Sequence, residues 1–536
     1  MDDKGGIESY DVVVIGAGIS GMYALIRLRA LGFRARVFEA GTDVGGTWYW
    51  NRYPGARFDS ESYSYAFSFD PELLEEWNWS EHFAGQPETY RYLRRVAEKY
   101  DLRRDIEFNS RIRSLEYQEA GQDWITTTEA GKQVRSRFVI TAIGILSTPY
   151  FPPNPGKETF KGRSWHTSYW PKEPVDLTAQ RVGVIGTGAT AIQLITEISK
   201  NVGHLTVFQR TANFTKPLRN QPIRDEEQRA LKDRYPEMFG RCKQTFGAFI
   251  HDIDPRSIFD LEPAARREHL ERLWSEPGFG FWLGNFMDVF TDRKAAEIVS
   301  EFVREKIRER VKDPAVAAIL TPTDHPFGTK RVPLESGYYE AFNRPNVELV
   351  DLKKTPIQRF TETGLDTTDR SYAFDVIIYA TGFDAVTGSF NRMEIRGKNG
   401  QLLKDKWAEG PQTVLGLQVA GFPNLFTVVG PHNGAAFCNI PRCIEQNVDW
   451  VTSALAHLRK EQRRTIEAKP DAEIAWTEHV NGQVEQFLIG QIDSWFMGAN
   501  IPGKKRGFLA YFGGAPAYRA HCSDSVAKGY EGFEIS

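Results

Sequence analysis

The strongest indication of the fold in this chain is the segment Asp11-Val-Val-Val-Ile-Gly-Ala-Gly-Ile-Ser-Gly21. It begins as a run of β-branched residues, which is typical of a buried strand, and continues at once into Gly16, Gly18 and Gly21 in the spacing GxGxxG. The residues that follow, as far as Leu28, place apolar side chains at helical spacing. We therefore expect a strand, a tight glycine turn and a helix whose N-terminus can hold a pyrophosphate.

The same arrangement recurs once, later in the chain. Arg181-Val-Gly-Val-Ile is followed by a second turn and by an apolar-periodic helix that includes Gln193. The second turn reads Gly186-Thr-Gly188-Ala189-Thr190-Ala191, with alanine in place of the third glycine, a change that the fingerprint tolerates. Each copy is followed by a second strand that ends 23 residues beyond its first glycine. This shared context, rather than the glycines alone, indicates two dinucleotide-binding units.

The ends of these second strands differ in charge. Glu39 ends the first and can accept hydrogen bonds from an adenosine ribose, whereas its carboxylate would repel a 2′-phosphate. Gln209, Arg210 and Thr211 end the second, a neutral-to-basic set suited to a 2′-phosphate. We therefore predict FAD at the first unit and NADPH at the second. The alternative for Arg210 is a solvated surface arginine.

Two further strand-like segments, 138–144 and 375–382, end in Gly144 and in Ala-Thr-Gly382. Similar segments occur where a two-dinucleotide flavoprotein crosses between its domains. We expect an α/β fold with two interleaved Rossmann-like dinucleotide-binding domains and a helical insertion. The predicted boundaries are 1–145 and 385–536 for the FAD domain, 152–215 and 330–380 for the NADPH domain, and 220–328 for the insertion.

The composition of the chain limits which classes of partner it can bind. The chain has 536 residues and a net charge of −3, which argues against nonspecific binding to nucleic acid or to an anionic membrane surface. No apolar run reaches the roughly 18 residues of a membrane span, and the N-terminus carries acidic residues without the apolar core of a signal peptide. We expect a cytoplasmic protein with neither partner. The oligomeric state is open, with a monomer favoured.

The four cysteines form neither a disulfide framework nor paired zinc spacing, so no metal site is predicted. Cys438 and Cys443 fit the CxxxxC spacing of flavin disulfide reductases, but they stand late in the chain. Buried or unreactive cysteines are therefore the favoured interpretation.

Between the two glycine turns lies Phe160-Lys-Gly-Arg-Ser-Trp-His166-Thr-Ser-Tyr-Trp170-Pro171. It fits FxGxxxHxxxWP, the fingerprint of the flavin-dependent (type I) Baeyer–Villiger monooxygenases, which the chain resembles from about residue 10 to its end. A second motif of that family, Gly46-Thr-Trp-Tyr-Trp-Asn-Arg-Tyr-Pro-Gly-Ala-Arg-Phe-Asp59, is also complete. The resemblance implies NADPH- and O2-dependent oxidation of a ketone to an ester or lactone through a flavin C4a-peroxide.

The resemblance also implies the catalytic residues. Arg331, in the segment Gly-Thr-Lys-Arg, would stabilise the peroxide and the tetrahedral adduct, because a fixed cation lowers the cost of the negative charge that develops there. Asp59 would orient Arg331, and movement of Arg331 would admit the nicotinamide first. Lys330 would hold the NADPH 2′-phosphate together with Arg210. His166 is expected in a structural role in the linker rather than as a general base.

The same resemblance implies further contacts to the cofactors. Trp495 would reach NADPH when a loop closes, and the loop 430–440, with Phe437, would form a pocket beside the flavin ring. The remaining implied cofactor contacts are Ser20, Thr47, Trp48, Tyr49, Trp50, Arg57, Phe58, Asp59, Tyr65, Ile112, Thr190, Gln193, Arg331 and Ile440.

Two other functions stay open beside ketone oxidation. One is a flavin N- or S-monooxygenase of the same fold. The other is a nucleotide-dependent redox sensor without turnover, against which Arg331, Lys330 and both glycine turns argue, since a sensor needs no cation for an oxyanion.

Overall fold

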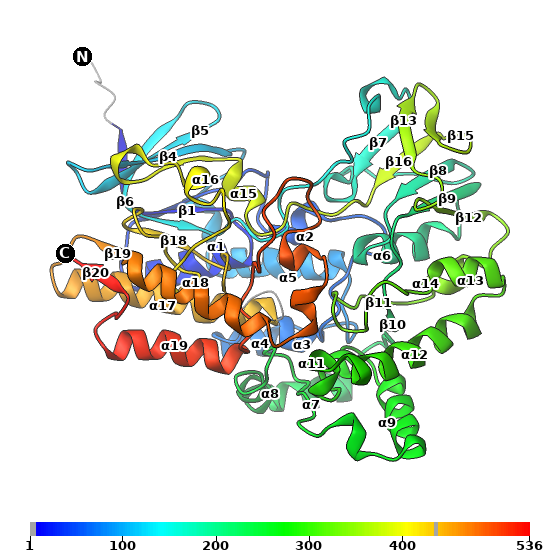
Figure 1. Cartoon of the computed structure of the whole chain (residues 1–536). Coiled ribbons are helices and arrows are strands. Elements are labelled where there is room, and N and C mark those ends of the chain that lie inside the picture. The colour runs from blue at the N-terminus through cyan, green and yellow to red at the C-terminus, as the bar shows by residue number, and fades with distance from the viewer. Residues whose placement is uncertain (1–6, 434–437) are drawn as a thin grey trace.

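A computed structural model describes residues 7–433 and 438–536 of the chain. Two sheets built largely of parallel strands stand apart in the upper half of the molecule, and helices fill the space below them (Figure 1). The prediction of an α/β fold with two dinucleotide-binding sheets is confirmed.

The larger sheet has eight strands in the order β17-β4-β5-β6-β1-β2-β3, with β18 also paired to β6. Its strands are β1 (Glu8–Ile15), β2 (Ala35–Phe38), β3 (Ile106–Glu107), β4 (Ile112–Gln118), β5 (Asp123–Thr128), β6 (Gln133–Thr141), β17 (Glu394–Arg396) and β18 (Leu425–Thr427). Val14 is paired in parallel with Val37 on one side and with Ile140 on the other. The β-branched run that opened the sequence analysis is therefore a central strand, buried on both faces.

The smaller sheet is entirely parallel, in the order β12-β9-β8-β16-β7. Its strands are β7 (Arg163–His166), β8 (Arg181–Ile185), β9 (His204–Gln209), β12 (Val347–Asp351) and β16 (Val376–Tyr379). A three-stranded antiparallel ribbon adjoins it: β13 (Ile357–Thr361), β14 (Gly364–Thr367) and β15 (Ser371–Ala373). Two short pairs complete the strands: β10 (Lys216–Pro217) with β11 (Leu334–Glu335), and β19 (Ile466–Ala468) with β20 (Phe533–Ile535).

Glycine turns join each first strand to its helix for the same steric reason. Gly16 has φ +101°, and a Cβ there would lie 2.5 Å from the carbonyl oxygen of Ala142, at the end of β6. Gly186 has φ +107°, and a Cβ there would collide with the carbonyl oxygen of Ala380, at the end of β16. Both turns therefore require glycine, and both lie against the strand at which the chain crosses between the sheets.

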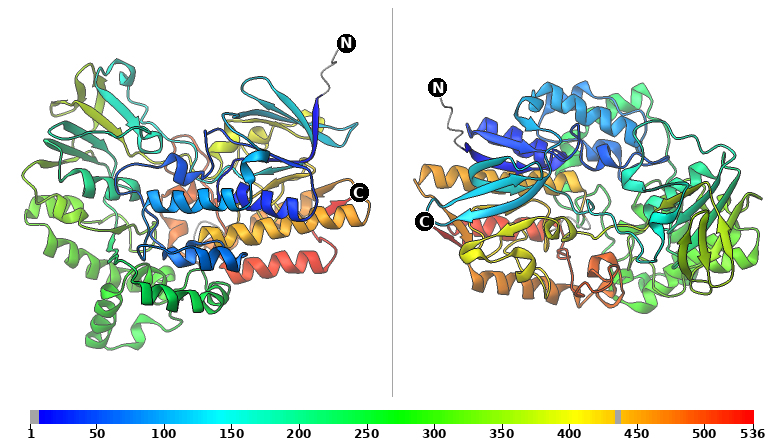
Figure 2. Two further views of the ribbon diagram at one scale, coloured as in Figure 1. Left: turned by 180° about the vertical axis from the view of Figure 1, so that it is seen from behind. Right: turned by 90° about the horizontal axis from the view of Figure 1, so that it is seen from above.

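Helices α1 (Ile19–Ala30) and α17 (Ile440–Lys460) lie side by side under the larger sheet, with α19 (Ala515–Ala527) beside α17 (Figures 1 and 2). The Tyr23 hydroxyl on α1 donates to Asp449 of α17 over 2.9 Å. The C-terminal part of the chain thus covers the N-terminal unit. The other helices near this sheet are α2 (Thr47–Trp50), α3 (Ser62–Tyr65), α4 (Pro71–Glu76), α5 (Gln86–Lys99), α15 (Gly388–Asn391), α16 (Leu403–Lys406) and α18 (Pro470–Val484).

Helix α6 (Ala189–Ile198) follows the second glycine turn, and α14 (Tyr338–Ala341) packs near it. The segment between the β10 and β11 strands is helical and lies at the lower right of Figure 1. It comprises α7 (Asp225–Asp233), α8 (Tyr235–Cys242), α9 (Pro263–Ser275), α10 (Gly280–Leu283), α11 (Asp288–Thr291), α12 (Arg293–Arg310) and α13 (Pro314–Leu320). The apolar residues Val299, Phe302, Val303 and Ile307 form the buried face of α12, as their spacing indicated.

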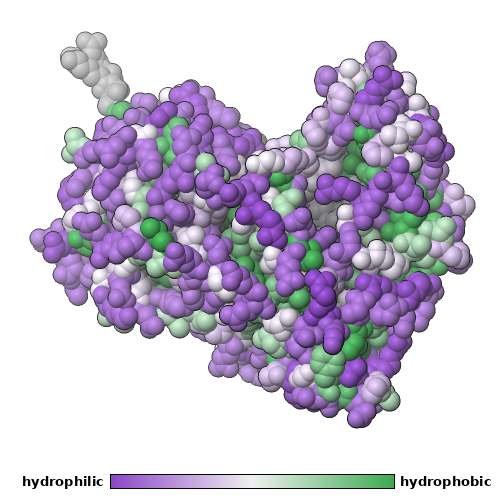
Figure 3. Space-filling view, in the orientation of Figure 1, coloured by the Kyte–Doolittle hydropathy of each residue, from purple (hydrophilic) through white to green (hydrophobic). Residues whose placement is uncertain are grey.

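The surface is mostly hydrophilic and is notched between the halves that carry the two sheets (Figure 3). None of the described helices combines the length and the apolar character that crossing a membrane would need.

Candidate functional site

A large cleft lies at the first glycine turn. The Gly16 turn, the end of β2, helix α2 and the start of β4 all contribute to its wall. The predicted cofactor residues that line it are Gly16, Gly18, Ser20, Glu39, Thr47, Trp48, Trp50, Tyr65, Ile112 and Ile440.

Glu39 is held at the end of β2 by backbone amides. Its carboxylate accepts hydrogen bonds from Ala17 N at 2.7 Å and from Gly41 N at 2.6 Å. Burial raises the pKa of Glu39, which is 4% exposed, while these amides and Arg111 oppose the rise. The glycine turn and the strand end therefore converge on one point, where a ribose hydroxyl could meet the carboxylate.

Several predicted residues do not line the cleft but support its wall. The Phe58 ring stacks on Tyr65 with a centroid separation of 4.4 Å, and the Tyr65 hydroxyl accepts a hydrogen bond from Trp48 Nε1 at 3.1 Å. Tyr49 contacts the hydroxyl of Thr42 at 2.8 Å. A Cβ on Gly21 would collide with the carbonyl oxygen of Gly16, so Gly21 allows the helix to begin close to the strand.

The polar residues of this cleft that sequence reasoning missed include Ser110, Arg111 and Glu129. Ser110 and Arg111 precede β4, and Glu129 N donates to Arg111 O at 2.8 Å. The sequence offered one indication of this, because Ser110 and Arg111 directly precede the predicted contact residue Ile112.

Asp59 and Arg331 meet in an ion pair, with Arg331 Nη1 2.5 Å from Asp59 Oδ2. The Asp59 side chain is 1% exposed, whereas the Arg331 side chain is 29% exposed. Leu334 N also donates to Asp59 Oδ2, at 3.1 Å. The carboxylate is thus fixed from two sides, and the guanidinium that it holds keeps a face open to solvent.

Further contacts hold the backbone and the guanidinium of Arg331. Asn213 Nδ2 donates to the carbonyl oxygen of Arg331 at 2.9 Å. The guanidinium carbon lies 5.5 Å from the centre of the Phe279 ring, which comes from the helical segment. That segment therefore contributes directly to the surroundings of the predicted catalytic arginine.

Gln193 on α6 ties the second glycine turn to the segment that ends in Asp59. Its Oε1 accepts a hydrogen bond from the Tyr53 hydroxyl at 2.8 Å, and its Nε2 donates to Arg57 O at 3.0 Å. Both predicted nucleotide sites are thereby brought to the same arginine–aspartate pair.

Three cations converge beyond the end of β9. Burial lowers the pKa of Lys330, Asp324 opposes this effect, and the positive charges of Arg210 and Lys353 lower the pKa further. Lys353 was missed because it follows β12, which only the parallel pairing with β9 brings alongside. Repulsion among these cations would be relieved by a bound dianion such as a 2′-phosphate.

Trp495 is half-buried and packs beside Ile145, Val386 and Leu509, near the crossings between the two sheets. Asp493, two residues earlier, is close enough to raise the pKa of Lys330. In the predicted pocket loop 430–440, residues 434–437, including Phe437, lie outside the described part of the chain.

His166 is fully buried, with both ring nitrogens engaged. Nδ1 lies 2.8 Å from Ser168 Oγ, and Nε2 lies 3.0 Å from the carbonyl oxygen of Gly382. Burial lowers the pKa of His166 to about 4. The ring therefore joins β7 to the chain that follows β16.

We expect this histidine to make stability depend on pH. The folded-state pKa is below the ordinary value of 6.5, so the stability that neutral His166 contributes is fully present above pH 6.5 and is lost as the pH falls towards about 4. The full effect is about 3 kcal/mol. Urea denaturation at pH 8 and pH 5 should show a smaller loss of stability in His166→Gln than in the wild type. The half-buried His204→Gln is the control, and an unchanged pH dependence in His166→Gln would contradict the expectation.

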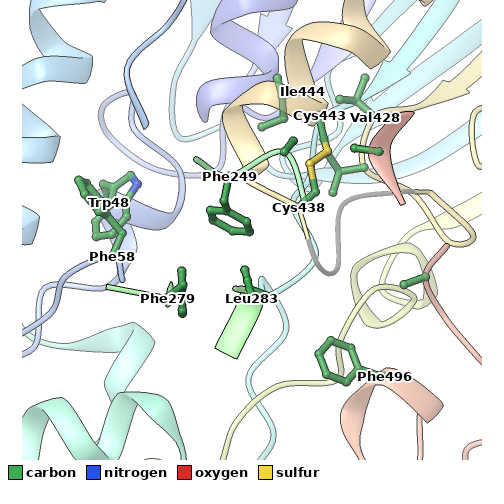
Figure 4. Packing of buried hydrophobic residues seen from close by; sticks show 14 of the residues in the cluster. Trp48, Phe58, Phe249, Phe279, Leu283, Val428, Cys438, Cys443, Ile444 and Phe496 are labelled. Carbon is green, nitrogen blue, oxygen red and sulfur yellow. A yellow bond between two sulfur atoms is a disulfide. The ribbon is translucent and has the colours of Figure 1, made fainter. Parts of the chain in front are cut away.

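The structure confirms that Cys438 and Cys443 are buried and adds a disulfide that the sequence analysis did not predict. Both are buried, at 6% exposure, but their sulfur atoms are joined in a disulfide (Figure 4). Cys438 precedes α17 and Cys443 lies in its first turn. The first turn of the helix therefore brings the two cysteines together although they are five residues apart in the sequence. The spacing alone did not indicate that a helix would begin between them. Cys242 and Cys522 are free thiols.

Comparison with known proteins places this geometry among flavoproteins. Residues 13–257 match the family described as pyridine nucleotide-disulphide oxidoreductase. Over its full length the chain is 43% identical to the full length of 2-oxo-Δ3-4,5,5-trimethylcyclopentenylacetyl-CoA monooxygenase from Pseudomonas putida. It is 39% identical to a Baeyer–Villiger monooxygenase from Pseudooceanicola batsensis, covering 97% of this chain and 95% of that protein. A phenazine N-monooxygenase from Lysobacter antibioticus is 38% identical, covering 98% of this chain and 96% of that protein.

Solved structures agree with these relatives. A crystal structure of OTEMO in complex with FAD and NADP superposes with a TM-score of 0.96 at 44% identity, covering 99% of this chain and all of that one. Cyclohexanone monooxygenase from Rhodococcus sp. Phi1, bound to NADP+, superposes with a TM-score of 0.97 at 40% identity and the same coverage.

Proposed function

The chain belongs to the Baeyer–Villiger monooxygenases, and we propose that it uses NADPH and O2 to convert a ketone into an ester or lactone at the Asp59–Arg331 pair. The observation that carries the proposal is that pair itself: a buried carboxylate holding a partly open arginine where the two glycine-turn units meet. Membership of the family confirms the resemblance first seen in the two motifs.

The residues present fit FAD and NADPH. The Gly16 turn leaves no room for a side chain beside its cleft, and the Glu39 carboxylate suits a ribose without a phosphate. The cations Arg210, Lys330 and Lys353 suit the additional phosphate of NADPH. When both are bound, FAD supplies the redox chemistry that links NADPH to O2.

In this proposal Arg331 is the catalytic residue. Oxidation of a ketone to an ester passes through negative charge on oxygen, and the guanidinium donates hydrogen bonds to that charge while remaining protonated. Asp59 is a positioning residue, because its second hydrogen bond, from Leu334 N, fixes the direction in which it holds the arginine. The Phe279 ring restricts water on one side of the guanidinium.

A second candidate is oxygenation of nitrogen or sulfur, which the 38% identity to a phenazine N-monooxygenase favours. Such an oxygenation requires no stabilised oxyanion, so the fixed Asp59–Arg331 pair supports the ketone reaction over it. A redox sensor without turnover has no use for the pair at all.

The purified flavoprotein should consume NADPH faster when a ketone such as cyclohexanone is added. One ester or lactone should appear for each NADPH oxidised, identified by mass spectrometry over a panel of ketones. NADPH oxidation that yields only hydrogen peroxide with every ketone would overturn the assignment. Product from amines or sulfides alone would instead support the second candidate.

Three further assignments belong to the proposal. The domain boundaries predicted from sequence are supported by the sheets, because the eight-stranded sheet draws its strands from residues 8–141 and 394–427, and the five-stranded sheet from 163–209 and 347–379. The other two assignments are a cytoplasmic location and a monomeric state. Cell fractionation and light scattering test these two assignments.

A further inference from the structure

The disulfide of Cys438 and Cys443 lies in the wall of the candidate site. Figure 4 shows it beside Phe249 and near Ile444, and Ile440 and Ile444 line the large cleft. Asn439 N donates to Gly247 O at 2.8 Å, and Asn439 Nδ2 donates to Ser64 O at 3.1 Å. The segment that carries both cysteines is therefore attached to α3, which ends at Tyr65, and to the helical segment.

The backbone here accommodates either oxidation state. The two Cα atoms are 6.5 Å apart, within the range of about 4.4–6.8 Å that a disulfide spans. Cys438 Sγ lies 3.3 Å from the carbonyl oxygen of Asn439, which can accept a hydrogen bond from a thiol when the pair is reduced. Neither state therefore demands that the chain be rebuilt.

The position on α17 favours reaction at these sulfurs. Asn439 caps the 21-residue helix, so Cys438 stands just before its positive end and Cys443 lies within its first turn. A helix N-terminus stabilises a thiolate, the form that reacts with peroxides.

The two free cysteines lack these features. Cys242 ends α8, at the unfavourable end of a helix dipole, and Cys522 lies within α19. Burial raises the pKa of each thiol to about 11. They serve as internal controls for reactivity.

We propose that Cys438 and Cys443 are a reversible redox-modification site in the wall of the large cleft at the first glycine turn, oxidised by hydrogen peroxide and reduced by an external dithiol. One thiolate attacks a peroxide oxygen, which breaks the O–O bond and gives a sulfenic acid and, after protonation, one water. The second thiol displaces the sulfenic hydroxyl as a second water and closes the S–S bond. Two electrons pass from sulfur to peroxide. A dithiol returns them and becomes a disulfide itself.

This activity is separate from that of the disulfide oxidoreductases whose family model matches the chain. That match ends at residue 257, so both cysteines lie outside it. The pair is instead placed to sense peroxide made when the reduced enzyme meets O2 without a ketone. Closing the S–S bond ties the residues before α17 to its first turn, next to Ile440.

Peptide mapping tests the site directly. The holoenzyme is reduced with dithiothreitol, desalted, treated with hydrogen peroxide, alkylated with N-ethylmaleimide in denaturant and digested with trypsin. Cleavage after Arg442 leaves Cys438 in the peptide 407–442 and Cys443 in the peptide 443–459, joined only by the S–S bond. We expect four alkylated cysteines before peroxide, two after it with these peptides linked, and four again after further reduction.

Four alkylated cysteines after excess peroxide, or over-oxidation of one of the pair without a cross-link, would overturn the proposal. Because this measurement uses the wild-type chain, it stands even if a variant folds poorly. It also does not depend on turnover, so its failure would leave the ketone reaction untouched.

Variants supply a second readout. Oxidation should raise the melting temperature of the wild type and of Cys242→Ala by about 1–3 °C, because the short loop becomes constrained in the unfolded chain. Cys438→Ser and Cys443→Ser should show no shift. An equal shift in either serine variant would show that the stabilisation arises elsewhere and would contradict the assignment.

Discussion

Arg331→Ala should bind FAD and be reduced by NADPH, yet lose nearly all of its ester formation. Asp59 holds the wild-type guanidinium at 2.5 Å with one face open, so truncation removes the cation while leaving both glycine turns in place. Loss of one preorganised oxyanion partner costs about 10²–10³ in rate, roughly 3–4 kcal/mol of transition-state stabilisation. Bleaching of the flavin absorbance without oxygen measures reduction, and mass spectrometry of the ketone product measures oxygenation.

Two further variants show whether ester formation depends on the charge of Arg331 or on its orientation. Arg359→Ala removes an arginine that also pairs with an aspartate, Asp366 at 2.8 Å, but on the exposed ribbon beside the smaller sheet. It should retain ester formation. Asp59→Asn should fall between the wild type and Arg331→Ala, since the arginine then keeps its charge and loses its orientation. Ordinary ester formation by Arg331→Ala would show that another group stabilises the oxygen.

Lys330→Ala should raise the KM for NADPH by about 10- to 100-fold and leave the KM for NADH nearly unchanged. The fold-change corresponds to one charge-assisted contact to phosphate, worth about 1.5–3 kcal/mol. It is measurable because the positive charges of Arg210 and Lys353 act on the lysine and favour a dianion as its partner, while Asp324 offsets part of that charge. Steady-state kinetics with both nucleotides at a fixed ketone concentration give the two constants.

Three comparisons sharpen this experiment. Arg210→Ala should likewise raise the KM for NADPH and leave the KM for NADH nearly unchanged. If both side chains contact one phosphate, the binding free energy lost in the double variant should be smaller than the sum of the two single losses. Lys354→Ala, the neighbour of Lys353, is the control for a general loss of positive charge. An equal rise in KM for NADH and NADPH would place the 2′-phosphate elsewhere.

The parts of the fold that sequence predicted are those whose evidence is local. A strand, a glycine turn, a helix and the end of the next strand span few residues, so Gly16 and Glu39 were placed together before any tertiary contact was known. Asp59 and Arg331 are different, because a whole dinucleotide unit and the helical segment separate them. Nothing short of tertiary structure, or a resemblance to chains that share it, brings them together.

The features that sequence reasoning missed also depend on tertiary structure. Lys353 joins the cations only through the pairing of β12 with β9, which no periodicity reports. The disulfide was not predicted because a separation of five residues fits many conformations, and only the start of α17 between the two cysteines brings the sulfurs into contact. In both cases the residue type indicated what chemistry the side chain could perform, but the sequence did not show which residues lie next to it in the folded chain.

The late strands of the larger sheet also constrain how the chain folds as it is synthesised. β17 completes one edge of that sheet, β18 pairs with β6, and α17 covers α1, although β1 and α1 leave the ribosome first. Until residue 460 has emerged, the nascent N-terminal unit exposes an unpaired strand edge and the apolar side of its first helix. The smaller sheet, completed by β16, can close earlier. The cleft proposed for FAD is therefore completed only when the start of α17, whose Ile440 and Ile444 line it, has been made.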